Sequence, residues 1–172
     1  KDFGYLKIFN IYTEAELRDI WREIFYLDYV MDLPRFQKHR IKESAKNLDG
    51  VHKMSGSGLY LNQMYIDPEC SPIYNYSRKL FDREISESFS KVHPANTINK
   101  TNSDALWLNR YQHSQEYAPH VDESVFTGLT VLLHESKKIN GGELSFPDYD
   151  ISFGTIHNCC ILFPSWVKHG VS

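Results

Sequence analysis

The sequence has little cysteine, no excess of basic residues and no apolar run long enough to span a membrane. Its three cysteines are too few for a fully paired disulfide scaffold. We therefore expect free thiols in a reducing compartment and a cytoplasmic location, since no secretory signal opens the chain. Lysine and arginine number 19 against 22 aspartates and glutamates. The resulting net charge of −3 argues against non-specific nucleic-acid binding.

The composition that remains is globular and rich in aromatic rings. Apolar residues make up 41% and charged residues 24%, which excludes a disordered chain. The aromatic share of 14% suits a tightly packed β-rich core or a pocket lined with rings. The length suits one domain over residues 1–172. Because the chain begins at Lys1 and stops at Ser172 just after an apolar run, we expect a fragment or a missing C-terminal part.

Residues 1–100 are predicted to be mostly helical. Thr13 and Glu16 form a capping-box pattern, and apolar residues then recur at helical spacing. Residues 32–57 are polar and basic, which predicts a solvated loop, with a substrate-docking surface as the alternative. A second helix is predicted over Ser71–Val92, with a proline in its first turn.

After residue 100 the pattern changes from helices to strands. Short segments rich in β-branched and aromatic residues are separated by turn residues. These segments are Ala105–Tyr111, Val125–Leu133, Glu143–Phe146 and Cys159–Phe163. Helices followed by a run of strands predict an α+β fold. We expect a small antiparallel barrel or jelly roll over residues 101–172, supported by the helices of residues 1–100.

Three residues carry the predicted chemistry. His120 and Asp122 form a His-x-Asp pair at a strand end, where side chains two positions apart lie on one face. One imidazole and one carboxylate can therefore reach a single cation. His169, just past another apolar strand, is the candidate for the third ligand. Two histidines and one carboxylate leave the opposite face of a metal open, as in the facial triad of non-heme Fe(II) oxygenases.

The order of the surrounding motifs adds specificity. The aromatic strand that ends at Tyr111 is followed by His-x-Asp, Gly-Gly-Glu-Leu-Ser-Phe, Phe-Pro-Ser and His-Gly-Val. In this order residues 105–172 resemble the Fe(II)/2-oxoglutarate-dependent dioxygenases, in their prolyl-4-hydroxylase-like branch. The resemblance implies a double-stranded β-helix (jelly-roll) core, with Fe(II) held by His120, Asp122 and His169. It also implies 2-oxoglutarate and O₂ as cosubstrates and admits ascorbate as a cofactor.

The same resemblance assigns residues to the cosubstrate. Tyr111 precedes the first metal histidine as the family's tyrosine does, and would hydrogen-bond 2-oxoglutarate. Asn109 and Tyr111 together resemble the Asn-x-Tyr of related nucleic-acid demethylases, where both residues touch the cosubstrate. In the family, an Arg or Lys about nine or ten positions after the second histidine pairs with the distal carboxylate. The chain stops three residues after His169, so we expect this anchor beyond Ser172.

The implied activity is oxidative decarboxylation of 2-oxoglutarate coupled to hydroxylation of a C–H bond. The expected substrate is a prolyl or other amino-acid side chain in a protein or peptide, or else a small molecule. A nucleic-acid dealkylase is one alternative, which the Asn-x-Tyr suggests and the net negative charge disfavours. A cupin-like module that binds a metal without turnover is the other, and the complete triad disfavours it. Neither a membrane nor a nucleic acid is expected as a partner.

Overall fold

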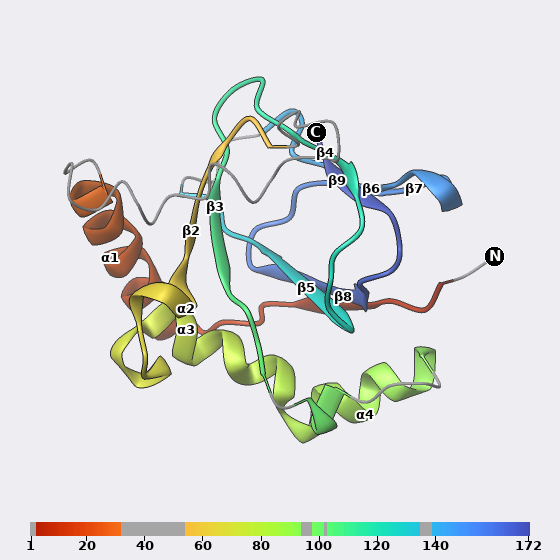
Figure 1. The fold of residues 1–172 in the computed structure, drawn as a ribbon, viewed down its shortest axis with the longest axis horizontal. Helices are drawn as coiled ribbons and strands as arrows, with labels where there is room; N and C mark the ends of the chain where they lie inside the picture. Colours follow the sequence, from red (N-terminus) through yellow and green to blue (C-terminus); the bar gives the residue numbers. More distant parts are fainter. Residues whose placement is uncertain (1–2, 32–53, 94–97, 102, 135–138) are drawn as a thin grey trace. The chain divides into compact units, whose positions relative to one another are not determined.

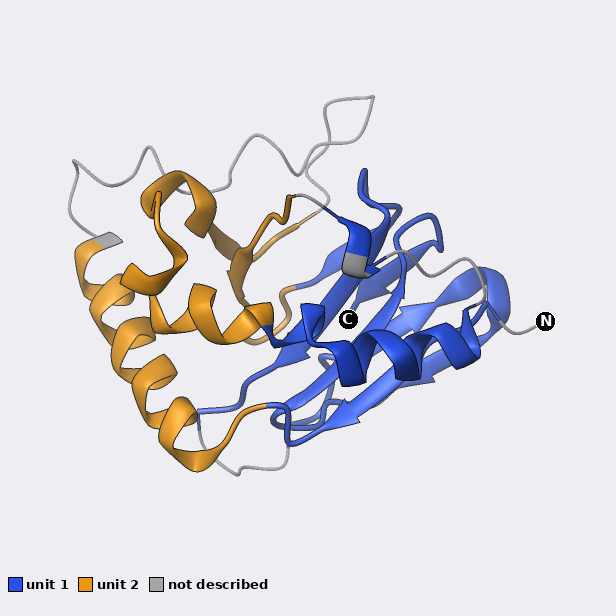
Figure 2. Cartoon of the chain, turned by 90° about the horizontal axis from the view of Figure 1, so that it is seen from below, with its two compact units in different colours: residues 1–11, 79–102, 116–172 blue, residues 12–78, 103–115 orange. Residues whose placement is uncertain are grey.

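The structure is a computed structural model whose chain forms two compact units. Figure 2 colours unit 1 (residues 1–11, 79–102 and 116–172) and unit 2 (residues 12–78 and 103–115) separately. The description that follows covers residues 3–31, 54–93, 98–101, 103–134 and 139–172. Most of the basic loop predicted over residues 32–57 lies outside the described residues, as do residues 135–138 of the loop that follows His134.

Unit 1 contains a three-stranded antiparallel sheet in the order β1 (Leu6–Phe9), β8 (Cys159–Pro164) and β5 (Phe126–Val131). Figure 1 shows these strands side by side. All six residues of the central β8 are buried, and they form an uninterrupted run of apolar residues and cysteines. Such a run is typical of a strand that is covered on both faces.

The second sheet of unit 1 has four antiparallel strands. Their order is β4 (Tyr117–His120), β9 (His169–Val171), β6 (Leu144–Phe146) and β7 (Ile151–Phe153). The short helix η5 (Pro147–Tyr149) joins β6 to β7. Because β9 pairs with β4, this sheet brings the predicted second metal histidine beside the strand that ends at the first.

One apolar core joins the two sheets. Phe146 of β6 and Phe163 of β8 meet edge to face, with ring centroids 5.0 Å apart. Buried side chains around this pair complete the cluster: Phe3, Leu144, Ile161 and Val167. Because β6 and β8 belong to different sheets, burial of these side chains holds the sheets together.

Helix α4 (Arg83–Val92) covers the three-stranded sheet, and Figure 1 shows it running below β1 and β8. Its Phe89 is fully buried against Leu162 of β8 and against Ile98 of the short helix η4 (Ile98–Lys100). The outer side chains of β8 thus also face apolar neighbours, which explains why this strand shows no alternation of polar and apolar residues.

Unit 2 contains α1 (Glu14–Met31), α2 (Leu61–Met64), η2 (Pro68–Cys70) and α3 (Pro72–Ser77), with one strand pair, β2 (Ser57–Tyr60) and β3 (Trp107–Arg110). The predicted capping box is confirmed, because the backbone N–H of Thr13 donates to Glu16 at 2.7 Å and that of Glu16 donates to Thr13 Oγ1 at 3.3 Å. Buried Glu23 of α1 accepts hydrogen bonds from Ser71 Oγ and Ile73 N, which holds the start of α3 against α1.

The predicted mixture of helices and antiparallel strands is confirmed, but some elements differ. The single helix expected over Ser71–Val92 is interrupted: α3 gives way to η3 (Arg78–Phe81), and Asp82 has an extended backbone with ψ 145° before α4 begins. An aspartate is a favoured N-cap, so it suits a new helix start. Strands β1, β2, β7 and β9 were not predicted, and β4 was implied only by the strand end expected at His120; each of these has only three or four residues, too few for a clear alternation. Among the described residues, no helix is long and apolar enough to cross a membrane.

Candidate metal centre

His120 and His169 face each other across two paired strands of unit 1. His120 ends β4, His169 begins β9, and the two residues are direct partners in the antiparallel register. Side chains of directly opposite residues lie on the same face of a sheet. Their imidazole centroids are accordingly 4.5 Å apart. Strand pairing thus brings together two histidines that are far apart in the sequence.

A bulge in β4 shapes this side of the site. Tyr117 pairs with Val171 and His120 with His169, so β4 has one more residue than β9 over this stretch. The extra residue brings the Tyr117 and His120 rings into a stack, 3.9 Å between centroids and 16° between planes. Gly170 lets the strands approach, since a Cβ there would come within 2.9 Å of the Tyr117 carbonyl oxygen. The glycine of His-Gly-Val therefore has a packing role.

Asp122 lies between the two imidazoles. Its Oδ1 is 3.3 Å from His120 Nε2, and its Oδ2 is 3.5 Å from His169 Nε2. One ligand atom from each of the three residues lies within 4.8 Å of the others. Neighbouring ligands of a six-coordinate ion at about 2.1 Å are roughly 3 Å apart, so small adjustments would suit one ion. The predicted three residues are thus brought together in one unit.

Backbone carbonyls orient both imidazoles. His120 Nδ1 is 2.9 Å from the Ala118 carbonyl oxygen, and His169 Nδ1 is 2.9 Å from that of Val167. A carbonyl oxygen can only accept, so each Nδ1 carries the proton and donates it. In a neutral imidazole the Nε2 lone pair is then free, and both lone pairs point toward Asp122. Two nitrogen lone pairs and a carboxylate directed at one point form a site for a cation.

The electrostatics of the site favour the metal-binding forms. His169 is only 3% exposed, and this burial lowers its pKa despite the opposing effects of the Val167 carbonyl and Asp122. Burial alone would raise the pKa of Asp122, but the adjacent imidazoles and the hydrogen bond from Thr127 outweigh burial and lower it. Neutral imidazole and ionised carboxylate are the forms that bind metals. The apolar wall behind His169 includes Phe163, whose ring centroid is 4.8 Å away.

Sequence reasoning missed the hydroxyl groups around Asp122. Thr127 Oγ1 donates to Asp122 Oδ2 at 2.6 Å and lies 2.7 Å from Ser165 Oγ. Ser165 Oγ is in turn 2.6 Å from Ser124 Oγ, and the Ser165 carbonyl accepts from the Asp122 backbone N–H at 3.1 Å. Ser165 and Thr127 lie far apart in the sequence, and no local pattern marks a serine or threonine as a partner of a distant carboxylate.

The residues predicted to hold the cosubstrate lie in unit 2. Asn109 belongs to β3, opposite Gly58 of β2, and Tyr111 follows that strand directly. Gly56 leaves room for the Tyr111 ring, since a Cβ at Gly56 would come within 3.1 Å of it. The Oδ1 atom of Asn109 is buried and has no hydrogen-bond partner among the described residues. A buried polar atom without a partner is costly, and it is a feature of sites that receive a ligand.

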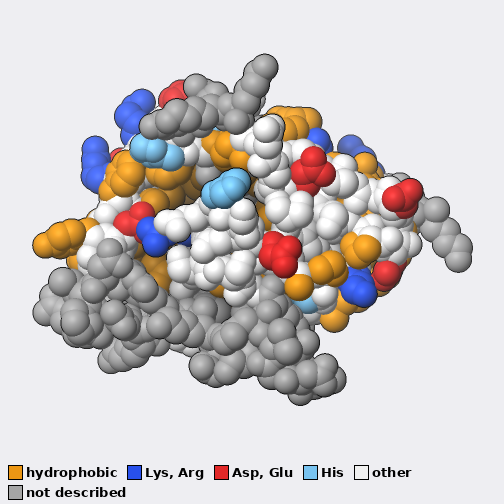
Figure 3. All heavy atoms as spheres, turned by 90° about the horizontal axis from the view of Figure 1, so that it is seen from above, with side chains coloured by type: hydrophobic (Ala, Val, Ile, Leu, Met, Phe, Trp, Pro, Cys, Tyr) orange, Lys and Arg blue, Asp and Glu red, His pale blue; other side chains and the backbone are white. Residues whose placement is uncertain are grey.

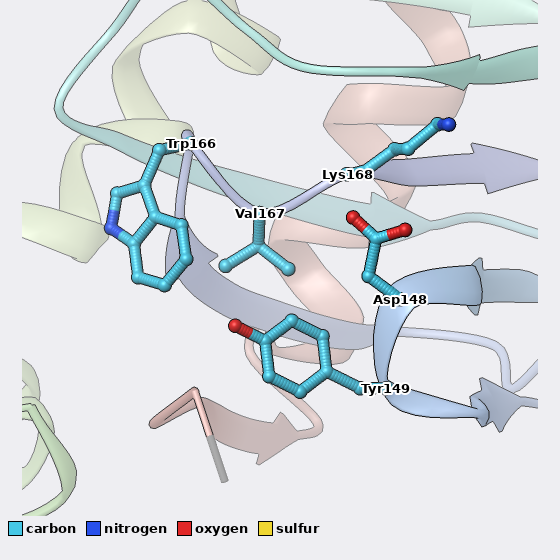
Figure 4. A pocket seen from close by; sticks show the side chains of 5 residues that line it. All are labelled: Asp148, Tyr149, Trp166, Val167 and Lys168. Carbon is cyan, nitrogen blue, oxygen red and sulfur yellow. The ribbon is translucent and has the colours of Figure 1, made fainter. Parts of the chain in front are cut away.

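A hollow of about 390 Å³ lies beside the turn that precedes β9. Figure 4 shows its walls: the rings of Trp166 and Tyr149 on either side of Val167, with Asp148 and Lys168 further along. Trp166 is 59% exposed, and Lys168 is exposed whereas the adjacent His169 is buried. Neighbouring residues of an extended chain face opposite ways, so the exposed Lys168 points away from the triad that contains the buried His169.

No protein-family model and no curated protein matches the sequence. Solved structures do match, and two of them are prolyl hydroxylases. A Pseudomonas putida prolyl-4-hydroxylase has a TM-score of 0.65 and 13% identity, over 98% of this chain and 84% of that one. The 2-oxoglutarate complex of the viral collagen prolyl hydroxylase from Paramecium bursaria Chlorella virus-1 has a TM-score of 0.61 and 14% identity, over 98% and 87% of the two chains. The chain therefore has a prolyl-4-hydroxylase-like fold, and the predicted resemblance is confirmed at the level of the fold.

Proposed function

We propose that the protein is an Fe(II)- and 2-oxoglutarate-dependent dioxygenase that hydroxylates a prolyl or other amino-acid side chain. The observation that carries this proposal is the convergence of His120 Nε2, His169 Nε2 and the Asp122 carboxylate within one unit. The prolyl-4-hydroxylase-like fold supports it independently. The two antiparallel sheets of unit 1 would be the two faces of a double-stranded β-helix.

The three residues fit a metal ion of this class. Imidazole nitrogens and one carboxylate suit Fe(II), and three ligands leave positions open, unlike a closed structural zinc site. When bound, Fe(II) and 2-oxoglutarate together supply oxidation of a C–H bond by O₂, with succinate and CO₂ as coproducts. The protein's own contribution is to orient both imidazoles through the Ala118 and Val167 carbonyls, and burial of His169 favours its neutral, metal-binding form.

Asn109 and Tyr111 are our proposed cosubstrate ligands. An amide oxygen would repel the carboxylates of 2-oxoglutarate, but rotation of the Asn109 amide by half a turn exchanges Oδ1 for the Nδ2 donor. The buried position that now lacks a partner would then offer an N–H to the ligand. The Tyr111 hydroxyl would donate to a carboxylate of the same molecule. Ascorbate would serve as an accessory reductant.

A peptide is the substrate that the surface of unit 1 supports best. The rings of Trp166 and Tyr149 flank the hollow beside β9, and flat aromatic surfaces bind proline-rich segments. Val167, which lines the hollow, also accepts a hydrogen bond from His169 Nδ1 through its carbonyl, so the lining of the hollow contacts one of the proposed metal ligands. The thiols of Cys70, Cys159 and Cys160 are free, which supports a reducing, cytoplasmic location as part of the proposal.

A nucleic-acid substrate has less support. On the face in Figure 3, the described Lys and Arg side chains are scattered among acidic and apolar ones and do not merge into one basic surface. The net charge of −3 also disfavours binding to phosphates. The observation in favour of dealkylation is the Asn109-x-Tyr111 pattern, which serves 2-oxoglutarate equally well in a hydroxylase.

The test is turnover by the whole chain. The protein with Fe(II), 2-oxoglutarate, O₂ and ascorbate is incubated with a library of proline-containing peptides, and succinate and a gain of one oxygen in the peptide are measured. We expect both with wild type and neither with His120→Ala. Metal binding without succinate for any peptide would contradict the proposal and favour a module that binds metal without turnover. Salt-sensitive binding of single-stranded DNA, with product formed from alkylated bases, would favour the dealkylase.

A further inference from the structure

Three hydroxyl groups form an unbroken line that ends on the carboxylate of Asp122. Ser124 Oγ is 2.6 Å from Ser165 Oγ, which is 2.7 Å from Thr127 Oγ1, which is 2.6 Å from Asp122 Oδ2. The residues come from three places in unit 1: the turn after Asp122, strand β5 and the turn between β8 and β9. Distances of this length are typical of good O–H···O hydrogen bonds.

Counting protons fixes the direction of every bond in this line. Each hydroxyl has one proton, and an ionised carboxylate has none, so Thr127 donates to Asp122. Thr127 can then only accept from Ser165, and Ser165 can only accept from Ser124. The alternative acceptor for Ser124, the Phe126 carbonyl, is 3.2 Å away and therefore the weaker choice. Hydrogen bonds aligned in one direction polarise and strengthen one another.

Ser165, the middle member, is held rigidly. Its side chain is fully buried, its backbone N–H donates to the Val125 carbonyl at 3.2 Å, and its carbonyl accepts from the Asp122 N–H at 3.1 Å. Ser165 thus contacts the Asp122 backbone directly and the Asp122 side chain through Thr127. Asp122 is thus held at its backbone N–H and at its carboxylate, which restricts rotation of the carboxylate.

We propose that Thr127 and Ser165 are positioning residues that make Asp122 a ligand through Oδ1 alone. This inference rests on the proposed function, since it needs a metal at the triad. Oδ2 already accepts the short bond from Thr127 and lies 3.5 Å from His169 Nε2, whereas among the described residues the neighbour recorded for Oδ1 is His120 Nε2 at 3.3 Å. A carboxylate bound through one oxygen leaves a coordination position open that a chelating carboxylate would fill. The hydroxyl line would therefore preserve the room that a bidentate cosubstrate and O₂ require.

The test compares metal binding by the full chain and its variants. Thr127→Val removes the hydroxyl that donates to Asp122, and Thr127→Ser keeps it. Ser165→Ala keeps the Thr127 hydroxyl but removes the hydrogen bond between Ser165 and Thr127. Thr130→Val, on the same strand, is the matched control, because the Thr130 hydroxyl interacts with Cys160. Mn(II) affinity is measured by titration calorimetry, and Co(II) geometry by visible absorption under argon. Thermal unfolding of the metal-free variants separates positioning from stability.

We expect Thr127→Val to weaken Mn(II) binding about 10-fold or more, because the carboxylate is no longer held in place. The Co(II) spectrum should change as well, because the released carboxylate can bind through both oxygens. Ser165→Ala should weaken binding about threefold. Thr127→Ser and Thr130→Val should match wild type in affinity and spectrum. Wild-type affinity and spectrum in Thr127→Val would overturn the inference; should that variant not fold, the same result in Ser165→Ala would do so. Absence of His120-dependent metal binding in wild type would overturn the proposed function together with this inference.

Discussion

The two units differ in how completely their candidate site residues are satisfied. In unit 1, each residue of the triad has a fixed partner: Ala118 for His120, Val167 for His169 and Thr127 for Asp122. In unit 2, the Oδ1 of Asn109 is buried with no partner among the described residues. The chain itself supplies a hydrogen-bond partner for each residue of the triad, whereas the buried Asn109 oxygen has none among the described residues.

From this difference we expect metal binding and cosubstrate binding to depend on different residues. A metal site gains affinity when its ligands are held in place before the ion arrives, because no ordering remains to be done on binding. An unpartnered amide has the opposite property, since its cost is relieved only when a ligand supplies the missing hydrogen bond. We therefore expect variants in unit 1 to affect the metal, and variants at Asn109 to affect the cosubstrate.

The largest effect is expected from loss of a metal ligand. Asp122→Ala should lower Mn(II) affinity by more than about 100-fold, because two neutral imidazoles without a carboxylate hold a hard divalent ion poorly. Titration calorimetry measures the affinity. Asp148→Ala, which removes an exposed carboxylate outside the triad, serves as the control and should bind like wild type. Equal Mn(II) affinities for the two variants would contradict the assignment of Asp122 as a metal ligand.

The next effect concerns the cosubstrate. Asn109→Ala should raise the Kd for 2-oxoglutarate about 5- to 10-fold in the metal-loaded protein, as expected for one lost hydrogen bond to a charged group. Its Mn(II) affinity in the absence of 2-oxoglutarate should not change. Gln112→Ala alters an exposed amide in the same segment and provides the matched control. If Asn109→Ala lowered the Mn(II) affinity instead, the assignment of metal binding to unit 1 and of cosubstrate binding to Asn109 would be wrong.

A pH effect is expected from His169. Its imidazole has an ordinary pKa of 6.5 in the unfolded chain, and burial lowers the pKa in the folded protein. As pH falls from about 6.5 toward the folded pKa, the unfolded chain binds the proton first, so the metal-free protein loses stability. Urea unfolding of wild type and His169→Gln between pH 8 and 5.5 measures this loss. The variant should show a shallower decline; parallel declines would show that His169 is not the group responsible.

The smallest effect is expected at the hollow beside β9. Trp166→Ala should raise the KM for a peptide substrate a few-fold while leaving the Mn(II) and 2-oxoglutarate affinities unchanged, because the ring contributes contact area rather than a ligand. Phe9→Ala, another exposed ring of unit 1 that does not line the hollow, is the control. An unchanged KM for Trp166→Ala would show that the peptide does not bind at the hollow beside β9.

The sequence was informative where chemistry follows from short spacing and motif order. His-x-Asp, the apolar strand before His169 and the order of the surrounding motifs predicted the three residues, whereas the pairing of β4 with β9 that places the two histidines opposite each other was not predicted. The hydrogen bonds and ring contacts that hold the three residues in place were not predictable in this way. Ser165 meets Thr127 because two turns lie together, and Tyr117 stacks on His120 because a bulge adds a residue to β4.

The helical part shows the same limit. The capping box at Thr13 predicted the start of α1, since both partners lie within one turn of the helix. The break at Asp82 was missed, because apolar residues keep their helical spacing on both sides of it. The orphaned oxygen of Asn109 could not be foreseen either, because burial of one atom depends on the packing of β3 against its neighbours.

The most direct test of the central claim is the visible absorption of the anaerobic protein on addition of Fe(II) and 2-oxoglutarate. Our account predicts the weak charge-transfer band of iron chelated by the keto acid in wild type, and no band in His120→Ala. Asn109→Ala should give the band only at higher 2-oxoglutarate concentration. Iron that binds without producing a band in wild type, or a band of full intensity in His120→Ala, would contradict it.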